Sequence, residues 1–210
     1  MLTKSTFRLE IRSLLLTNIT NKALLSGDQI PLAKLAKDLG VSVTPVREAL
    51  TQLTESGIVT YVENRGFFVT KLNDEEAVEV YELIALLESN ALLNSHFTEL
   101  DIQHLKAINE RFKTAKSVKA RLDLDTTFHE MLISKHLNKT SHKIMEDLRV
   151  KLNLHELAFW DEEDSAKSIE SHQDIIFCIE KGDMAAAAKA LRHNWLAPIE
   201  AFRTSLNPTH

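Results

Sequence analysis

Apolar positions in the first third of the chain follow a helical period and then change to the pattern of strands. Apolar residues recur every three or four positions in three successive stretches, which predicts helices at 7–25, 31–39 and 44–53. Thr44 and Pro45 are expected to begin the third helix, as its N-cap and first helical residue. After Gly57 two runs rich in β-branched and aromatic residues flank a polar turn, which predicts a β-hairpin from 58–62 and 67–70.

The remainder of the chain, from Asn73 onward, shows helical spacing and no further strand pattern. It divides into about six predicted helices, near 74–98, 101–116, 118–136, 139–158, 166–181 and 183–205. The fold class is therefore mainly α. We expect a winged helix-turn-helix of three helices and a hairpin at 1–72, followed by an all-α helical bundle at 73–210.

Composition supports two modest globular domains. The 210 residues are 44% hydrophobic, with only 5 Gly and 4 Pro, so most of the chain can form regular, packed structure. No stretch approaches the roughly 20 apolar residues of a membrane span, and the opening residues lack a secretory signal. Cys178 is the single cysteine, which fits a reducing compartment. We therefore expect a cytoplasmic protein with no membrane partner.

Charge differs between the two predicted domains. The chain carries a net charge of −5, but residues 1–72 hold 9 Lys and Arg against 6 Asp and Glu. Residues 73–210 hold 16 basic and 24 acidic residues. A basic N-terminal domain followed by an acidic C-terminal domain is typical of a protein in which only the first domain contacts the phosphates of double-stranded DNA.

The predicted third helix and the hairpin tip carry candidate DNA contacts. The N-terminus of the second helix of a helix-turn-helix enters the major groove, where side chains and free backbone N–H groups meet bases and phosphates. Arg47 can bridge guanine O6 and N7 or pair with phosphate, and the hairpin tip can enter the minor groove. The candidates are Ser42, Thr44, Arg47, Thr51, Asn64, Arg65 and Gly66. The alternative for Arg47 is a surface ion pair with Glu48 or Glu55.

The same region resembles a known family. The uninterrupted sequence 35–50, with its string Val-Ser-Val-Thr-Pro-Val-Arg-Glu-Ala-Leu, and the later segments 55–59 and 65–69 resemble the bacterial GntR family of regulators. The resemblance implies that Thr44 and Arg47 contact the operator, with help from the wing tip. Val43 and Ala33 stand where many relatives have basic residues, which predicts weaker DNA binding and a shallower salt dependence.

Two histidines and an aspartate in the second domain share faces with apolar residues. Asp125 and His129 are four positions apart, so both project from the helix face that also carries Leu122 and Leu132. His172 shares its face with Ile175, Ile176 and Ile179. Carboxylate and imidazole groups that converge in a bundle core can hold zinc, nickel or manganese. The alternative is that these are hydrogen-bonded core side chains with a structural role.

The helical region also resembles the FadR-type C-terminal (FCD) domain of that family. The resemblance rests on the motifs at 81–88, 125–129, 171–175 and 182–183, and it implies an effector cavity that holds a metal in many members. It assigns Asp125, His129 and His172 as ligands and points to Asn194 for the fourth, where a His is usual; His193 is the alternative. Because Ile84 stands where relatives often have Arg, Arg149 is expected to supply positive charge for an anionic effector.

Together these observations predict a homodimeric DNA-binding transcription repressor, not an enzyme, controlled by a small-molecule effector such as a carboxylate. Two alternatives remain at this point. An open Asp/His/His site would also suit a metal-dependent hydrolase, although no general base or nucleophile lies at recognisable spacing beside it. A non-inducible architectural DNA binder would need no effector at all.

Overall fold

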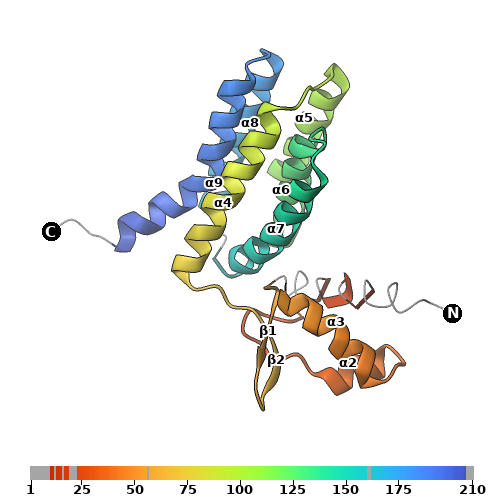
Figure 1. Cartoon of the computed structure of the whole chain (residues 1–210). Coiled ribbons are helices and arrows are strands. Elements are labelled where there is room, and N and C mark those ends of the chain that lie inside the picture. The colour runs from red at the N-terminus through yellow and green to blue at the C-terminus, as the bar shows by residue number, and fades with distance from the viewer. Residues whose placement is uncertain are drawn as a thin grey trace. The chain divides into compact units, whose positions relative to one another are not determined.

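The chain forms two compact units. In the computed structural model they are Met1–Asn73 with Asn153–Ala158, and Asp74–Leu152 with Phe159–His210. The structure describes residues 10–11, 13–15, 17–18, 23–55, 57–159 and 162–206, and their side chains except at 154, 157–159, 162–165 and 200–206. The predicted fold class is confirmed: helices dominate, and a small hairpin follows the N-terminal helices (Figure 1).

The first unit contains a helix-turn-helix and a hairpin. Its described helices and strands are α2 (Leu32–Asp38), α3 (Val43–Glu55), β1 (Val59–Val62) and β2 (Gly66–Val69). Parts of the expected first helix, at 10–11, 13–15 and 17–18, are also helical, while Phe7 and Ile19 lie outside the described residues. The core gathers side chains from all these segments, including Ile11, Leu15, Val46, Leu50 and Ile58, each fully buried.

The helix α3 begins earlier than the sequence pattern predicts. Its first residue is Val43, so Ser42 precedes the helix and Thr44 lies inside the first turn. The prediction that Thr44 caps this helix is therefore wrong. Pro45 is compatible with this start, because the first turn of a helix has backbone N–H groups without partners inside the helix, and proline lacks that group.

The strands pair as an antiparallel hairpin, with Val59 opposite Val69 and Val62 opposite Gly66. A third segment, which the sequence pattern does not show, joins the outer edge of β2. Gln29 forms a bridge with Phe68, and the Ile30 amide donates to the Phe67 carbonyl. The loop before α2 thereby covers the edge of β2, which a two-stranded hairpin would leave open.

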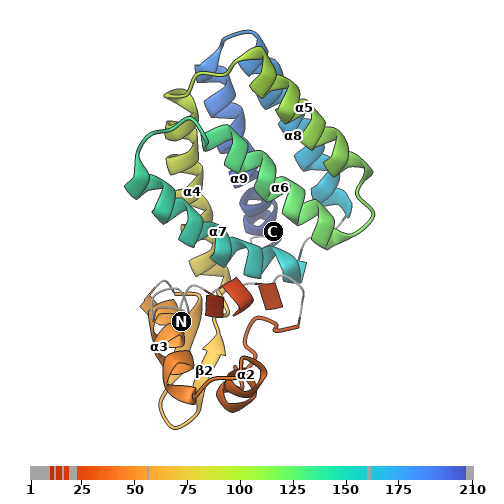
Figure 2. The same ribbon diagram turned by 90° about the vertical axis from the view of Figure 1, so that its right-hand side faces the viewer.

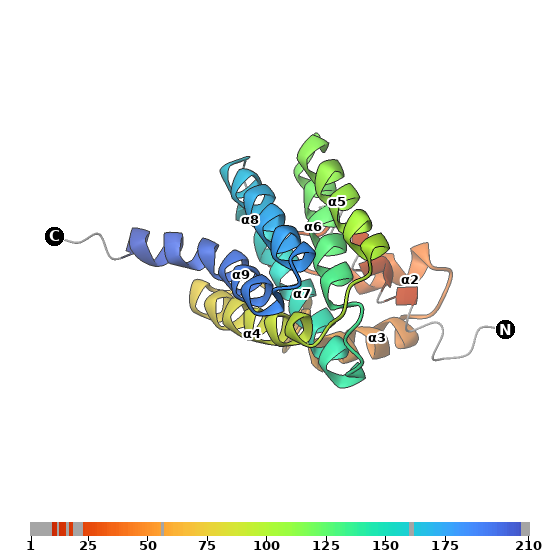
Figure 3. The ribbon, with the colours of Figure 1, turned by 90° about the horizontal axis from the view of Figure 1, so that it is seen from above.

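The second unit is a bundle of six helices among the described residues, as expected. They are α4 (Asp74–Leu93), α5 (Glu99–Thr114), α6 (Val118–Ile133), α7 (Lys139–Phe159, of which Asn153–Ala158 are assigned to the first unit), α8 (Glu162–Glu180) and α9 (Met184–Leu206). Helix α9 packs along both α4 and α8, and α5 packs along α6 and α8, as Figures 2 and 3 show. None of the described helices has the length and apolarity needed to cross a membrane.

The loop between α4 and α5 differs from the prediction for a local reason. Helix α4 ends at Leu93 rather than near 98. The Thr98 hydroxyl accepts from the Asp101 amide, and the Asp101 carboxylate accepts from the Thr98 amide, which forms a capping box. This motif fixes the start of α5 at Glu99 and excludes Thr98 from the preceding helix.

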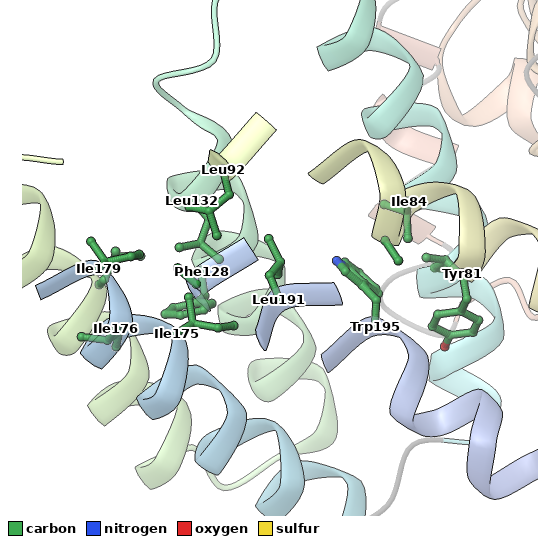
Figure 4. Close-up of a cluster of buried hydrophobic side chains, with 14 of the residues drawn as sticks. Tyr81, Ile84, Leu92, Phe128, Leu132, Ile175, Ile176, Ile179, Leu191 and Trp195 are labelled. Carbon is green, nitrogen blue, oxygen red and sulfur yellow. The ribbon is translucent and has the colours of Figure 1, made fainter. Parts of the chain in front are cut away.

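The core of the bundle joins all six of these helices. Buried side chains from α4, α6, α7, α8 and α9 pack with those of α5, and Figure 4 shows Leu132 beside Leu92 and Phe128 beside Ile175. Tyr81 and Trp195 lie next to each other at one end of this cluster, with ring centroids 6.1 Å apart. Several polar side chains are enclosed in the same core, and they form the candidate site.

Candidate functional site

The candidate DNA contacts of the first unit lie on one outward face. Ser42, Thr44, Arg47 and Thr51 are all exposed, whereas Val46, Ala49, Leu50 and Leu53 of α3 are buried against the core. The Thr51 hydroxyl donates to the Arg47 carbonyl at 2.9 Å, so its oxygen remains available as an acceptor. The structure thus presents these residues at the beginning and middle of one helix surface.

The hairpin tip carries the remaining candidate DNA contacts. Asn64 has φ +60° and Gly66 has φ +94°, conformations that asparagine and glycine adopt more readily than other residues. Asn64 and Arg65 are exposed, and the Arg65 guanidinium lies 5.1 Å from the centre of the Phe68 ring. This cation–π contact holds the arginine near the hairpin while leaving its N–H groups accessible.

In the second unit the structure brings Asp125, His129 and His172 together. One donor atom from each lies within 4.8 Å of the others, although α6 supplies the first two and α8 the third. The His172 Nε2 atom is 3.4 Å from Asp125 Oδ1, and His129 Nε2 is 3.8 Å from Asp125 Oδ2. All three residues are buried, with exposed fractions of 6%, 1% and 0% for Asp125, His129 and His172.

Each imidazole is oriented by a second polar residue from another helix. Glu88 of α4 lies with its Oε2 2.8 Å from His129 Nδ1, and Asn109 of α5 has its Oδ1 3.2 Å from His172 Nδ1. A carboxylate and an amide oxygen only accept hydrogen bonds, so both Nδ1 atoms donate. In a neutral imidazole the proton is then on Nδ1, and both Nε2 atoms present lone pairs to Asp125.

The arrangement leaves one buried atom without a hydrogen-bond partner. Among the described residues, the only such side-chain atom is His172 Nε2. The His172 ring is enclosed by aromatic neighbours, since it stacks on Phe128 with centroids 3.8 Å apart and lies 5.4 Å from Phe112. Burial lowers the pKa of His172, which favours the neutral ring with a free Nε2 lone pair.

Glu88 connects this cluster to two further side chains. Its Oε1 accepts from Nε and Nη2 of Arg149, and its Oε2 accepts from Trp195 Nε1 at 2.8 Å. Burial raises the pKa of the Glu88 carboxyl, but Arg149, His129 and Trp195 outweigh that effect and hold the pKa below its usual value. A fully buried carboxylate is therefore ionised and shared by α4, α6, α7 and α9.

The carboxyl of Asp125 behaves in the same way. Burial raises its pKa, while His172, His129 and Arg149 together lower it below the usual value, so the group carries a negative charge. The cluster therefore contains the two carboxylates of Asp125 and Glu88, and Arg149 is the cation beside them. The charges of these two carboxylates and of Arg149 sum to about −1.

Two further predicted site residues, Arg149 and Asn194, are not among the three converging donors. Arg149 is buried in α7, and its Nη1 also donates to the Thr126 carbonyl at 3.1 Å, so it is engaged with protein groups. Asn194 is half-buried on α9, whereas the neighbouring His193 is exposed. The roles of Arg149 as an effector contact and of Asn194 as a fourth ligand stay predictions.

Glu88, Asn109 and Trp195 are members of the cluster that the sequence reasoning did not select. A signal was present for two of them. Glu88 continues the buried stripe of α4 that holds Tyr81, Ile84 and Leu92, and Asn109 continues the stripe of Leu105 and Phe112 on α5. A polar residue inside an apolar stripe needs a buried partner, which marks it as part of a polar cluster.

Comparison with known families now places the chain. Residues 7–69 match the model of the bacterial regulatory proteins of the gntR family. Residues 79–196, which are more than half of the chain, match the model of the FCD domain. The chain belongs to the GntR family. It is a transcriptional regulator with an FCD effector-binding domain. The family resemblance of both regions is thereby confirmed.

Among its relatives is the Nta operon transcriptional regulator of Aminobacter aminovorans, 35% identical over 131 residues. That match spans 59% of this chain and 62% of the relative, so the regulator of A. aminovorans is similar over part of its length. A probable D-xylose utilization operon transcriptional repressor of Paenarthrobacter nicotinovorans is 26% identical over 95% of this chain and 90% of its own length.

Solved structures share the fold. The E. coli regulator McbR/YncC has a TM-score of 0.81 at 19% identity, covering 99% of this chain and 100% of that one. A GntR transcriptional regulator from Rhodococcus sp. RHA1 has a TM-score of 0.80 at 17% identity, with 91% and 94% coverage. At these identities the likeness supports the arrangement of helices and hairpin alone.

Proposed function

We propose that this regulator is a homodimeric repressor whose affinity for operator DNA is controlled by a small carboxylate. The carboxylate binds beside a divalent transition metal in the FCD domain. The observation that carries the proposal is the buried convergence of Asp125, His129 and His172. The proposed operator contacts are the exposed residues of α3 and of the hairpin tip described above. Zinc, nickel and manganese are the metals that this donor set suits.

The chemistry of the donors fits a cation. One carboxylate oxygen and two Nε2 lone pairs face one another in a buried space, and His172 Nε2 has no hydrogen-bond partner. Buried acceptors without donors are costly, and a bound cation would satisfy all three. Metal-binding histidines commonly donate their other ring N–H to a carboxylate or carbonyl, as His129 does to Glu88 and His172 to Asn109.

The charges of the cluster define the effector class. Glu88 balances Arg149, so Asp125 provides the uncompensated negative charge of the apo site. A divalent metal, when bound, would reverse the net charge to about +1 and supply a positive centre for an anionic group. Arg149 is still proposed to contact the effector, but the carboxylate of Glu88 largely neutralises its charge. We therefore propose that carboxylate binding depends on the metal.

The DNA-binding side of the proposal follows from symmetry. Operators read by helix-turn-helix proteins contain two half-sites about one DNA turn apart, so two copies of α3 are needed. An effector that binds one conformation of the dimer better than the other changes the fraction able to span both half-sites. The name of the P. nicotinovorans relative, a transcriptional repressor, supports repression as the direction of control.

Metal analysis of the purified full-length protein is the first test. The wild type is loaded with Zn²⁺, desalted and analysed beside His129→Ala and beside His104→Ala, which removes an exposed histidine of α5. We expect close to one metal per chain in the wild type and in His104→Ala, and a large loss in His129→Ala. Equal metal content in all three proteins would exclude the proposed ligands.

A second experiment tests the effector, and it uses DNA that the wild-type protein selects from a random-sequence pool. Fluorescence anisotropy then measures the affinity for that DNA while small carboxylates are added, with and without prior removal of metal. We expect a carboxylate to weaken binding only in the metal-loaded protein. A response that survives metal removal would contradict the metal-dependent part, and the absence of any response would favour an architectural DNA binder.

A further inference from the structure

The first residue of α3 is an exposed valine. Val43 has 38% of its surface accessible to solvent. The four apolar residues of the same helix that build the core of the first unit are each 2% exposed or less: Val46, Ala49, Leu50 and Leu53. Val43 is therefore an apolar side chain of α3 that the core leaves partly uncovered.

Helix formation gives no reason for a valine at this position. Valine has a lower helix propensity than alanine, because its β-branch restricts the χ1 angle. Its partial exposure also limits what Val43 contributes to the free energy of folding through burial. Single exposed apolar residues are ordinary on protein surfaces, so the role of this one depends on the side chains around it.

Val43 lies on the face of α3 that carries the candidate DNA contacts. Arg47 follows it by four positions and Thr51 follows Arg47 by four, and all three side chains are exposed. Residues four apart are neighbours on the surface of a helix. Exposed Ser42 directly precedes Val43, and exposed Thr44 directly follows it. An apolar group thus lies among side chains that otherwise offer hydrogen-bond donors and acceptors.

The major groove of DNA offers such an apolar group a specific partner. The edges of all base pairs display nitrogen and oxygen atoms there, and thymine in addition displays its 5-methyl group. Residues at the N-terminus of the second helix of a helix-turn-helix contact these base edges. The side chain of valine forms no hydrogen bond, so contact with a phosphate or a polar base atom would only remove water from that atom. The thymine methyl group is the partner that fits its chemistry.

We propose that Val43 is a specificity-determining residue that packs against the 5-methyl group of a thymine in each operator half-site. The inference rests on the proposed function in one respect, because it takes α3 as the helix that enters the major groove. It adds the base that one side chain reads, within an A·T pair. The stiff β-branched side chain loses little rotamer freedom on contact, so little entropy opposes the burial of the methyl group.

Replacement of thymine by deoxyuridine tests this contact, because it removes the methyl group and keeps the hydrogen-bonding atoms of the base edge. The thymines of the selected DNA are replaced one position at a time in both half-sites, and fluorescence anisotropy measures the affinity of the full-length protein. We expect at least one position at which binding weakens about fourfold per half-site, the factor that corresponds to burial of one methyl group. A wild type that binds every substituted DNA as tightly as the original would overturn the proposal.

The same set of DNAs is then measured with Val43→Ala. At the sensitive position we expect this variant to bind thymine and deoxyuridine DNA equally well, because the side chain that meets the methyl group has been shortened. Such a double-substitution cycle isolates the contact between the two groups. The methyl group also affects the shape and flexibility of DNA. A loss in Val43→Ala as large as in the wild type would assign the effect to DNA shape, and the proposed contact would be wrong.

Leu25→Ala is the matched control, since Leu25 is 53% exposed in the same unit and lies in the loop before α2. It should show the wild-type loss on deoxyuridine DNA. If the control also lost the methyl effect, the effect could not be assigned to Val43.

Selection of DNA from the random pool by Val43→Ala gives a second measurement that does not depend on affinity alone. We expect the preference for an A·T pair to disappear at one position of each half-site and to persist elsewhere. A variant that failed to fold would lose every preference. A selected sequence identical to that of the wild type would contradict the role of Val43.

Arg47→Ala separates a failure of this inference from a failure of the proposed function. If Arg47→Ala and Val43→Ala both left DNA binding unchanged, α3 would not be the DNA-reading helix, and both proposals would fail. If Arg47→Ala weakened binding while deoxyuridine had no effect on the wild type, the α3 face would stand and only the thymine contact would fail. Metal content has no part in either outcome, because Val43 belongs to the first unit and Asp125 to the second.

Discussion

The two units carry their candidate functional residues in opposite ways. Thr44 and Arg47 lie exposed on a helix whose other side is buried, and exposed Ser42 precedes that helix, while Glu88 and His172 are fully enclosed in a helical core. In the proposed function the first group contacts DNA, and its exposed side chains should contribute little to the folding of their unit. The second group is part of what holds the bundle together, so function and stability depend on the same side chains there.

Replacing a buried member should therefore affect stability far more than replacing an exposed one. Glu88→Leu leaves the Arg149 guanidinium buried without its carboxylate, and we expect unfolding free energy to fall by about 3–5 kcal/mol. Arg47→Ala should change it by less than about 0.5 kcal/mol. Urea denaturation of metal-free protein measures both.

Glu88→Gln is the control for this prediction, because it keeps the shape and the hydrogen-bonding oxygen while removing the charge. It should fall between the wild type and Glu88→Leu in stability. If Glu88→Leu were as stable as Arg47→Ala, the contrast between a structural buried cluster and a dispensable exposed face would be wrong.

The fourth ligand position gives a gain-of-affinity test of the same cluster. Asn194 shares the inner side of α9 with buried Ala187 and Leu191. Asn194→His replaces the amide with an imidazole nitrogen, which is a usual zinc ligand. We expect zinc to bind about tenfold more tightly, because changes of residues around a metal site typically alter metal affinity by about this factor. Competition with a chromophoric chelator measures the dissociation constant.

The neighbouring histidine decides between the two alternatives for this position. His193→Ala should leave zinc affinity unchanged, because His193 is exposed. A loss of affinity in His193→Ala, together with no gain in Asn194→His, would assign the fourth position to His193 instead.

The difference between the units also explains what the sequence could predict. The proposed DNA-binding face depends on local pattern, since exposed Arg47 and buried Val46 and Leu50 follow the period of one helix. Its hairpin was likewise visible in two short β-branched runs. The bridge of Gln29 to Phe68 was not, because its partners are far apart in sequence and Gln29 has no strand pattern around it.

The buried cluster was predictable only in part for the same reason. Asp125 and His129 are neighbours on one helix, so their spacing predicts that they share a face. The contact of His129 with Glu88, 41 residues away, and the contact of His172 with Asn109, 63 residues away, depend on how four helices pack. Spacing indicates the face of a helix, but it does not indicate which other helix covers that face.

A substitution of Arg47 tests the proposed DNA-binding face without changing the buried cluster. Arg47→Ala should weaken binding to the selected DNA by at least about 1 kcal/mol, because a charged contact to base or phosphate is lost. Zinc content and the urea midpoint should stay at wild-type values. Glu48→Ala, an exposed neighbour on α3, serves as the matched substitution and should not weaken binding. Unchanged affinity in Arg47→Ala would remove this residue from the proposed interface.

The smallest effect is expected at a polar cluster that belongs to the helical unit but lies outside its core. Asp101 accepts from the Thr98 amide and hydroxyl at the start of α5 and pairs with half-exposed Lys135. These donors lower the pKa of Asp101 from 3.8 to about 2. Because the folded pKa lies below the unfolded one, ionised Asp101 stabilises the fold above about pH 4, and this contribution is lost as the pH falls toward 2.

Asp101→Asn should therefore be less stable than the wild type at pH 7, and the difference should shrink between pH 4 and pH 2. Thermal unfolding at matched pH values measures both proteins, with Asp123→Asn as the control because Asp123 lies in an exposed i,i+4 pair with Lys119. A difference that stays constant down to pH 2 would show that the cap acts through shape rather than charge. The helical unit would then depend on ionised carboxylates only within its buried cluster, which would make the contrast between core and surface sharper.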